Sequence, residues 1–170
     1  MIFDLMTIKD ASASFDFTLE PSDINLDDET VKLRSAARVA GKIKKGIVQT
    51  DVEGRISADL TVECIRCLQP VDTTLNNPFI AGFVTVENYP QAKEAKLNQQ
   101  DLEVSLFAGD TIDLTELVRE QILLAVPEQV FCREDCKGLC LKCGANRNLI
   151  DCSCEEKEID PRWAALKNLK

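Results

Sequence analysis

Six of the eight cysteines of this 170-residue chain lie within residues 132–154, and the other two form a pair far upstream. The chain contains no histidine. Cysteine thiolates bind zinc tetrahedrally, and two cysteines that flank two other residues can reach the same ion. The spacing therefore predicts structural zinc binding, and the candidate metal ligands are Cys64, Cys67, Cys132, Cys136, Cys140, Cys143, Cys152 and Cys154.

The natural partition of these cysteines gives two zinc sites with four thiolates each. Cys64 and Cys67, which follow a predicted strand, would join Cys132 and Cys136, which follow a predicted helix. The four remaining cysteines would then form a second, local site. A single zinc site with four spare thiols is the alternative.

Three other uses of the cysteines are less consistent with the sequence. The first twenty residues contain five charged side chains, so we expect neither a signal peptide nor a membrane span there. We therefore expect a cytoplasmic protein. A reducing compartment disfavours disulfides. The spacing matches neither of the common ferredoxin patterns of iron–sulfur ligation. A thiol redox sensor, with Arg66 lowering a thiol pKa, remains a second alternative for the function.

An enzyme is not expected. Closed sites of four thiolates are structural, whereas catalytic zinc usually keeps an open position. The sequence has no histidine to serve as a general base, no glycine-rich phosphate loop and no nucleophile elbow. We therefore expect no small-molecule substrate.

The charge is strongly acidic and unevenly distributed. The formal net charge is −9, and residues 1–30 contain eight acidic residues against one lysine. Repulsion from phosphate makes such a chain a poor general nucleic-acid binder. One basic stripe in the region 32–45 could still contact RNA, or could form an ordinary solvated face; it comprises Lys32, Arg34, Arg38, Lys42, Lys44 and Lys45.

Alternating apolar and polar residues predict a sheet. Residues 31–43 and 48–64 each read as a long strand with one buried face, and Gly54 is expected to mark a bulge or bend. A two-residue turn at Lys45 and Gly46 would place Arg38 opposite Glu53. Further strands are expected at residues 2–8, 13–19, 71–86 and 102–107.

The sequence DLTELVREQILLAV predicts a helix over residues 113–126. Asp113 is a favourable N-cap and Glu116 fits a capping box. The expected fold class is α+β, with a mainly antiparallel, curled, barrel-like sheet plugged by this helix. We expect an antiparallel β domain at 1–130, a Cys-rich zinc module packed on it at 131–156 and a short C-terminal helix at 157–170.

Five motifs resemble the YceD family of large ribosomal RNA subunit accumulation proteins. They are VECIRCLQP (62–70), IDLTELVREQILLAVPEQVFC (112–132), EDCKGLCLKCGANRN (134–148), CSC (152–154) and DPRWAALKNL (160–169). The resemblance implies a non-enzymatic ribosome-biogenesis factor that supports the accumulation or processing of large-subunit rRNA. It supplies no catalytic residue.

Two mechanisms are compatible with that implication. The first is a zinc-stabilised acidic adaptor that binds a basic ribosomal protein or large-subunit assembly factor, through charge complementarity. The alternative is direct binding of precursor rRNA by the basic stripe, with help from Arg133, Lys137, Lys142 and Arg147. Neither mechanism involves a membrane.

Overall fold

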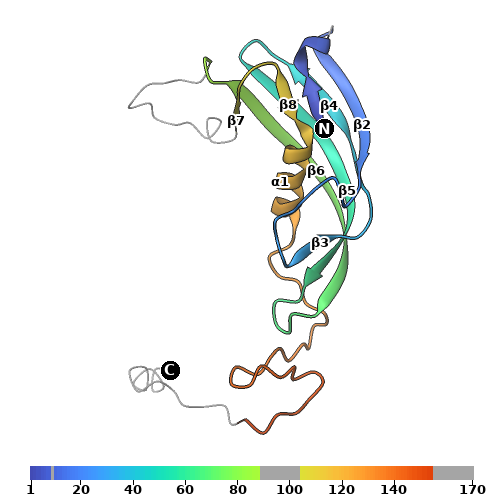
Figure 1. The fold of residues 1–170 in the computed structure, drawn as a ribbon, viewed down its shortest axis with the longest axis vertical. Coiled ribbons are helices and arrows are strands. Elements are labelled where there is room, and N and C mark those ends of the chain that lie inside the picture. The colour runs from blue at the N-terminus through green and yellow to red at the C-terminus, as the bar shows by residue number, and fades with distance from the viewer. Residues whose placement is uncertain (9, 89–103, 155–170) are drawn as a thin grey trace, which may run out of the picture.

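The computed structural model describes residues 1–8, 10–88 and 104–154. These residues form two β-sheets and one α-helix (Figure 1). In chain order the elements are β1 (Ile2–Asp4), the 3-10 helix η1 (Leu5–Thr7), β2 (Ser12–Leu19), β3 (Val31–Leu33), β4 (Ala37–Lys45), β5 (Gln49–Glu63), β6 (Pro70–Thr85), β7 (Val104–Phe107), β8 (Thr111–Asp113) and α1 (Leu114–Ala125).

The main sheet has six strands in the order β2-β4-β5-β6-β7, with β3 also paired to β5. Strand β5 is its centre, because β6 pairs along its whole length on one side while β3 and β4 share the other side. The long strand predicted at 31–43 is therefore split into β3 and β4. Its apolar residues still face the core, since Val31, Ala37, Val39 and Ile43 are all buried.

The sheet is open, so the predicted curled, barrel-like sheet is wrong. A barrel requires its two edge strands to pair, but β2 and β7 each have a neighbour on one side only. The sheet is also mixed, because β7 runs parallel to β6 over four residue pairs. The predicted bulge at Gly54 is absent, since the β5–β6 register continues unbroken from Glu53 through Gly54 to Arg55.

Gly54 has a packing role instead. It lies opposite Gly41 on β4, and the next residues in the same cross-strand row are Phe15 and Phe79. A Cβ atom at Gly41 would lie 2.3 Å from the Glu53 carbonyl oxygen and 2.6 Å from the tip of the Phe15 ring. Both phenylalanines are buried. The glycine pair therefore makes room for two aromatic rings on the core face of the sheet.

The hairpin between β4 and β5 also differs from the prediction. The last residue pair between the two strands is Lys45 with Thr50, so four residues lie between the paired positions instead of two. The first of these four, Gly46, donates its backbone N–H to the carbonyl oxygen of Gln49 at 2.9 Å. The longer turn shifts the register, so that Arg38 lies opposite Ser57, and Lys42 lies opposite Glu53.

Helix α1 and the small β1–β8 sheet cover one face of the main sheet (Figure 1). The side chain of Asp113 caps the helix by accepting the backbone N–H groups of Thr115 and Glu116. The Glu116 carboxylate accepts from the Arg119 guanidinium at 2.8 Å, within the first turns of the helix. The helix buries one apolar face against the sheet, formed by Leu114, Leu117, Val118 and Ile122.

The Cys-rich segment extends beyond one end of the main sheet (Figure 1). It contains no helix or strand among its described residues, only turns and an isolated bridge between Leu139 and Asn146. The predicted terminal helix lies in residues 155–170, outside the described residues. No described helix is long and apolar enough to cross a membrane.

Candidate metal centres

The first centre begins at the turn that joins β5 to β6. Cys64 directly follows the last residue of β5, in phase with the buried face of that strand, and its side chain has no exposed surface. The backbone N–H of Cys64 donates to Gln69 at 2.8 Å, while Leu68 donates to the Cys64 carbonyl oxygen at 2.9 Å. These bonds close a tight turn, here called the first knuckle (residues 64–68), that directs Cys64 and Cys67 to the same side.

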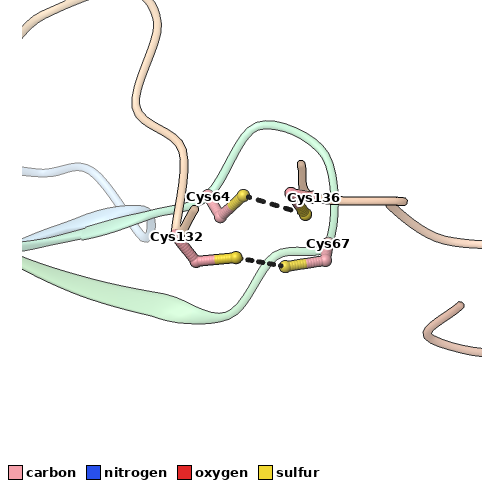
Figure 2. A group of neighbouring side chains, drawn as sticks. All are labelled: Cys64, Cys67, Cys132 and Cys136. Atoms are coloured by element: carbon pink, nitrogen blue, oxygen red, sulfur yellow. Dashed lines mark hydrogen bonds between the residues drawn. The ribbon is translucent and has the colours of Figure 1, made fainter. Parts of the chain in front are cut away.

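Two cysteines from the segment after α1 complete this centre (Figure 2). The sulfur atom of Cys136 lies 3.9 Å from that of Cys64, and the sulfur of Cys132 lies 3.5 Å from that of Cys67. All four sulfur atoms lie within 4.8 Å of one another. A backbone hydrogen bond of 3.0 Å, from the Ile65 N–H to the Val130 carbonyl oxygen, holds the segment after α1 against the first knuckle.

The second centre is local. The sulfur atoms of Cys140, Cys143, Cys152 and Cys154 also lie within 4.8 Å of one another. Its knuckle ends at Gly144, which has a φ of 72° and donates its backbone N–H to the Cys140 carbonyl oxygen at 2.8 Å. The structure thus groups the cysteines in the two sets of four that their positions suggested.

The geometry of the first centre fits a tetrahedral metal ion. Metal–sulfur bonds of about 2.3 Å give a tetrahedron whose sulfur–sulfur edges are about 3.8 Å. The Cys67–Cys132 and Cys64–Cys136 sulfur distances, 3.5 and 3.9 Å, fall on either side of that value. All eight cysteines are free thiols, so no disulfide competes for these sulfur atoms.

The electrostatics of the clusters favour a bound cation. The backbone N–H groups of Cys143 and Lys142 lower the pKa of Cys140 to about 6. In the same cluster, the contact between Cys154 and Cys143 raises the pKa of Cys154 to about 12. One thiolate therefore forms readily in the second cluster, while its crowded neighbours resist a further negative charge. Four thiolates at this spacing require a positive ion between them.

The first centre shows the same asymmetry. Burial raises the pKa of Cys64, but backbone N–H groups of Cys132, Arg66 and Cys67 outweigh it and lower the pKa to about 6. Burial and the contact with Cys67 raise the pKa of Cys132 to about 12. In both clusters, backbone N–H groups thus lower the pKa of one cysteine, while contact with a neighbouring cysteine raises the pKa of another.

Arg66 joins the first knuckle to the segment after α1. Its guanidinium donates to the carbonyl oxygens of Glu134 and Cys136 at 3.3 and 3.0 Å, and lies 4.4 Å from the centre of the Phe131 ring. The Arg66 carbonyl oxygen accepts the backbone N–H of Leu139 at 3.0 Å. Arg66 therefore holds the Cys132–Cys136 loop against the knuckle with both its side chain and its backbone.

Asn148 links the two centres. It lies in the loop that the second centre closes, yet its side-chain amide donates to the sulfur of Cys136, in the first centre, at 3.3 Å. Its amide oxygen accepts from Arg133 and from the backbone of Lys137 at 2.7 and 2.8 Å. Groups that hydrogen-bond to a ligand atom orient it and tune the affinity of a metal. Asn148 is placed to do so from the other centre's loop.

The two centres differ in burial. Cys64, Cys67 and Cys136 are at most 4% exposed and pack with Val71 and Leu139. Cys132 is the one exposed ligand of this centre. In the second centre Cys143 is exposed and the other three cysteines are half-buried. The first centre is thus part of the folded body, while the second is nearer the surface.

The basic stripe lies largely on the exposed face of the main sheet, and acidic partners occupy much of it. Arg38 pairs with Asp16 at 2.9 Å, and Lys44 pairs with Glu53 at 2.7 Å. Arg34, which follows β3, pairs with Asp72 at 3.0 Å. The Lys45 ammonium donates to the carbonyl oxygen of Leu5 at 3.4 Å, while Lys32 and Lys42 are exposed.

The structure adds two residues that the sequence did not single out for these roles. The sequence suggests that Arg66 lowers a thiol pKa through its charge, but its guanidinium contacts carbonyl oxygens. Asn148 is part of the family-like motif at 134–148, but its residue type and spacing indicate no contact with the first centre. Both act through loop geometry, which residue spacing does not reveal.

An open β-sheet that ends in two clusters of four cysteines defines a β-sheet protein with candidate structural metal centres. Residues 52–170 match the family model described as "Large ribosomal RNA subunit accumulation protein YceD". The chain belongs to the YceD family.

Two relatives show the extent of this likeness. The chain is 29% identical over 169 residues to YlbN of Bacillus subtilis, covering 99% of this chain and 94% of that protein. It is 38% identical over 157 residues to the maize "Large ribosomal RNA subunit accumulation protein YCED homolog 1, chloroplastic", covering 79% of this chain and 54% of that one. No solved structure matches.

Proposed function

We propose that this chain is a non-enzymatic cytoplasmic factor that supports the accumulation of large-subunit rRNA. In this proposal it acts as an acidic adaptor for a basic ribosomal protein or assembly factor, and two structural zinc ions hold its Cys-rich segment in place. The family description supports the process, and the two clusters of four thiols support the metal. Zinc is the ion that suits closed sites of four thiolates.

The observation that favours the adaptor over direct RNA binding is the neutralisation of the basic stripe. Arg34, Arg38 and Lys44 each have a carboxylate within 3.0 Å. An RNA phosphate would have to displace these carboxylates, in a chain whose net charge is already −9. A basic protein would meet complementary charge instead, which accelerates association.

The experiment compares two classes of partner at several salt concentrations. The purified chain is titrated with precursor rRNA fragments and, separately, with purified basic proteins of the large ribosomal subunit. We expect a ribosomal protein to bind at physiological salt and rRNA fragments to bind only at low salt.

A charge-reversal variant provides the contrary outcome. If rRNA binding survives at physiological salt and is lost in Arg34→Glu/Arg38→Glu, the adaptor mechanism is wrong. Arg55→Glu is the matched control, because Arg55 lies on the same face but outside the basic stripe and contacts Asn76 instead of a carboxylate.

A further inference from the structure

A groove of about 490 Å³ lies beside the first knuckle, between it and the C-terminal end of α1. Its lining includes the buried residues Val62, Cys64 and Val130. Leu123 and Val126, at the end of the helix region, also line it, and so does Leu68 of the first knuckle. We call this the knuckle groove. It is an apolar surface at the junction of the sheet, the helix and the first metal centre.

The charged residues around the knuckle groove have one sign. Asp28, Glu63 and Glu128 line it, and the described lining residues include no lysine or arginine. Three carboxylates beside an apolar floor repel phosphate groups and anionic lipid surfaces. They complement a segment that combines apolar side chains with lysine or arginine.

Leu68 has an unusual backbone conformation for its residue type. Its φ is 58°, and its N–H closes the first knuckle on the Cys64 carbonyl oxygen at 2.9 Å. Gly144 occupies the equivalent place in the turn of the second centre, here called the second knuckle (residues 140–144). Its φ is 72°, and its N–H donates to the Cys140 carbonyl oxygen at 2.8 Å. Glycine adopts this conformation without strain, whereas leucine does not.

The leucine side chain therefore does not serve the knuckle itself. It is 55% exposed, and its neighbour in the knuckle, Ile65, is 52% exposed. An exposed side chain contributes little to folding, and here it occupies a backbone position that glycine would fill with less strain. Strained positions of this kind cluster at binding and active sites.

We propose that the knuckle groove docks a cationic, apolar segment of a partner protein. The partner's apolar side chains pack on Leu68 and Ile65, and its lysine or arginine side chains face Asp28, Glu63 and Glu128. This inference rests on the proposed adaptor function and assigns its docking surface. Because the first knuckle forms one wall, the first metal centre also shapes the binding surface.

The test uses the full chain with zinc bound and a labelled synthetic peptide of alternating lysine and leucine pairs. A second peptide has serine in place of leucine, and a third has glutamate in place of lysine. We expect the first peptide to bind and to shift the backbone NMR signals of Ile65, Leu68 and Val126. The serine and glutamate peptides should each bind at least about tenfold more weakly.

Leu68→Gly separates docking from folding. We expect this variant to keep the metal content and melting temperature of the native chain, because glycine relieves the backbone strain. Its affinity for the lysine–leucine peptide should fall about tenfold. Leu141→Gly is the matched control, since Leu141 is exposed in the second knuckle and lies outside the groove. It should leave peptide binding unchanged. Glu63→Gln/Glu128→Gln should reduce the salt dependence of binding.

Contrary results are distinct from failure of the adaptor function. If purified basic ribosomal proteins bind the native chain and Leu68→Gly equally well, the knuckle groove is not the docking surface, although the adaptor function stands. Equal binding of the leucine and serine peptides would also refute the groove. Self-association of the native chain that rises with concentration and is abolished by Leu68→Gly would also refute the proposal. In that case a second copy of the chain would occupy the groove.

Discussion

Cys64 and Cys136 hold their sulfur atoms 3.9 Å apart although 72 residues separate them in the chain. The contact joins the end of the central strand β5 to the segment that follows α1. A metal ion at this point would close a long loop and fix the sheet, the helix and the Cys-rich segment together. The first centre would then contribute to folding of the whole β-sheet body.

Replacing Cys64 and Cys67 with serine should therefore destabilise the sheet. A structural zinc supplies on the order of 10 kcal/mol of folding free energy, against a total stability of about 5–15 kcal/mol for a typical domain. We expect the melting temperature of the β-sheet signal in circular dichroism to fall by about 10 °C or more. Cys140→Ser/Cys143→Ser should lower it far less, because the second centre closes only a local loop and none of its cysteines is fully buried. Equal effects of the two double variants would contradict a folding role specific to the first centre.

Asn148→Ala should weaken metal binding at the first centre without removing a ligand. The loss of the hydrogen bond to the Cys136 sulfur should reduce affinity about 10- to 100-fold. Competition with a coloured chelator measures the affinity, and the charge-transfer bands of the cobalt-substituted chain report on the thiolates directly. Asp151→Ala, in the same loop, is the control. Unchanged cobalt bands in Asn148→Ala would show that the bond has no influence on the metal.

Gly41→Ala should destabilise the fold by about 2–3 kcal/mol. The added methyl group would collide with the Glu53 carbonyl oxygen and the Phe15 ring, and the backbone of β5 cannot move aside easily. Denaturant unfolding measures the change. In the control Gly82→Ala, the nearest atom is the flexible end of the Gln49 side chain, so the cost should stay below about 1 kcal/mol. A loss at Gly82 as large as at Gly41 would contradict the packing account.

The pair of Asp16 and Arg38 should be visible in a pH titration. The hydrogen bond from Arg38 lowers the pKa of Asp16 below its ordinary value. The pair therefore stabilises the fold above the unfolded pKa of Asp16, and this contribution disappears as the pH falls through the lowered value. In Arg38→Ala, a carbon-13 NMR titration should show the pKa of Asp16 rising toward its ordinary value. An unchanged pKa would show that Arg38 does not pair with Asp16 in solution, which would remove Arg38 from the argument that the basic stripe is neutralised.

Local patterns in the sequence predicted most of the secondary structure. Alternation located β5, an apolar-rich run located β2, and the segment that returns after Pro70 contains the expected strand that corresponds to β6. The cap at Asp113 and the stop at Pro127 located α1 to within one residue at each end. What failed was the arrangement of the strands. Barrel closure depends on whether β2 meets β7, and the length of the β4–β5 turn depends on loop packing. Neither is encoded in the period of a single strand.

The cysteine grouping could be predicted because it follows from where the strand and helix end. The phase of Cys64 with the buried face of β5 placed it at the end of the central strand. The contacts of Arg66, Leu68 and Asn148 could not be predicted, because they depend on how loops of irregular structure fold against one another. Those contacts carry the linkage between the centres and the proposed docking surface.

The metal content of the purified chain tests the central claim most directly. Inductively coupled plasma mass spectrometry should find two zinc ions per native chain. It should find one zinc ion per chain in Cys64→Ser/Cys67→Ser and one in Cys140→Ser/Cys143→Ser. A single zinc ion in the native chain, lost completely in one double variant and retained completely in the other, would contradict the account of two centres.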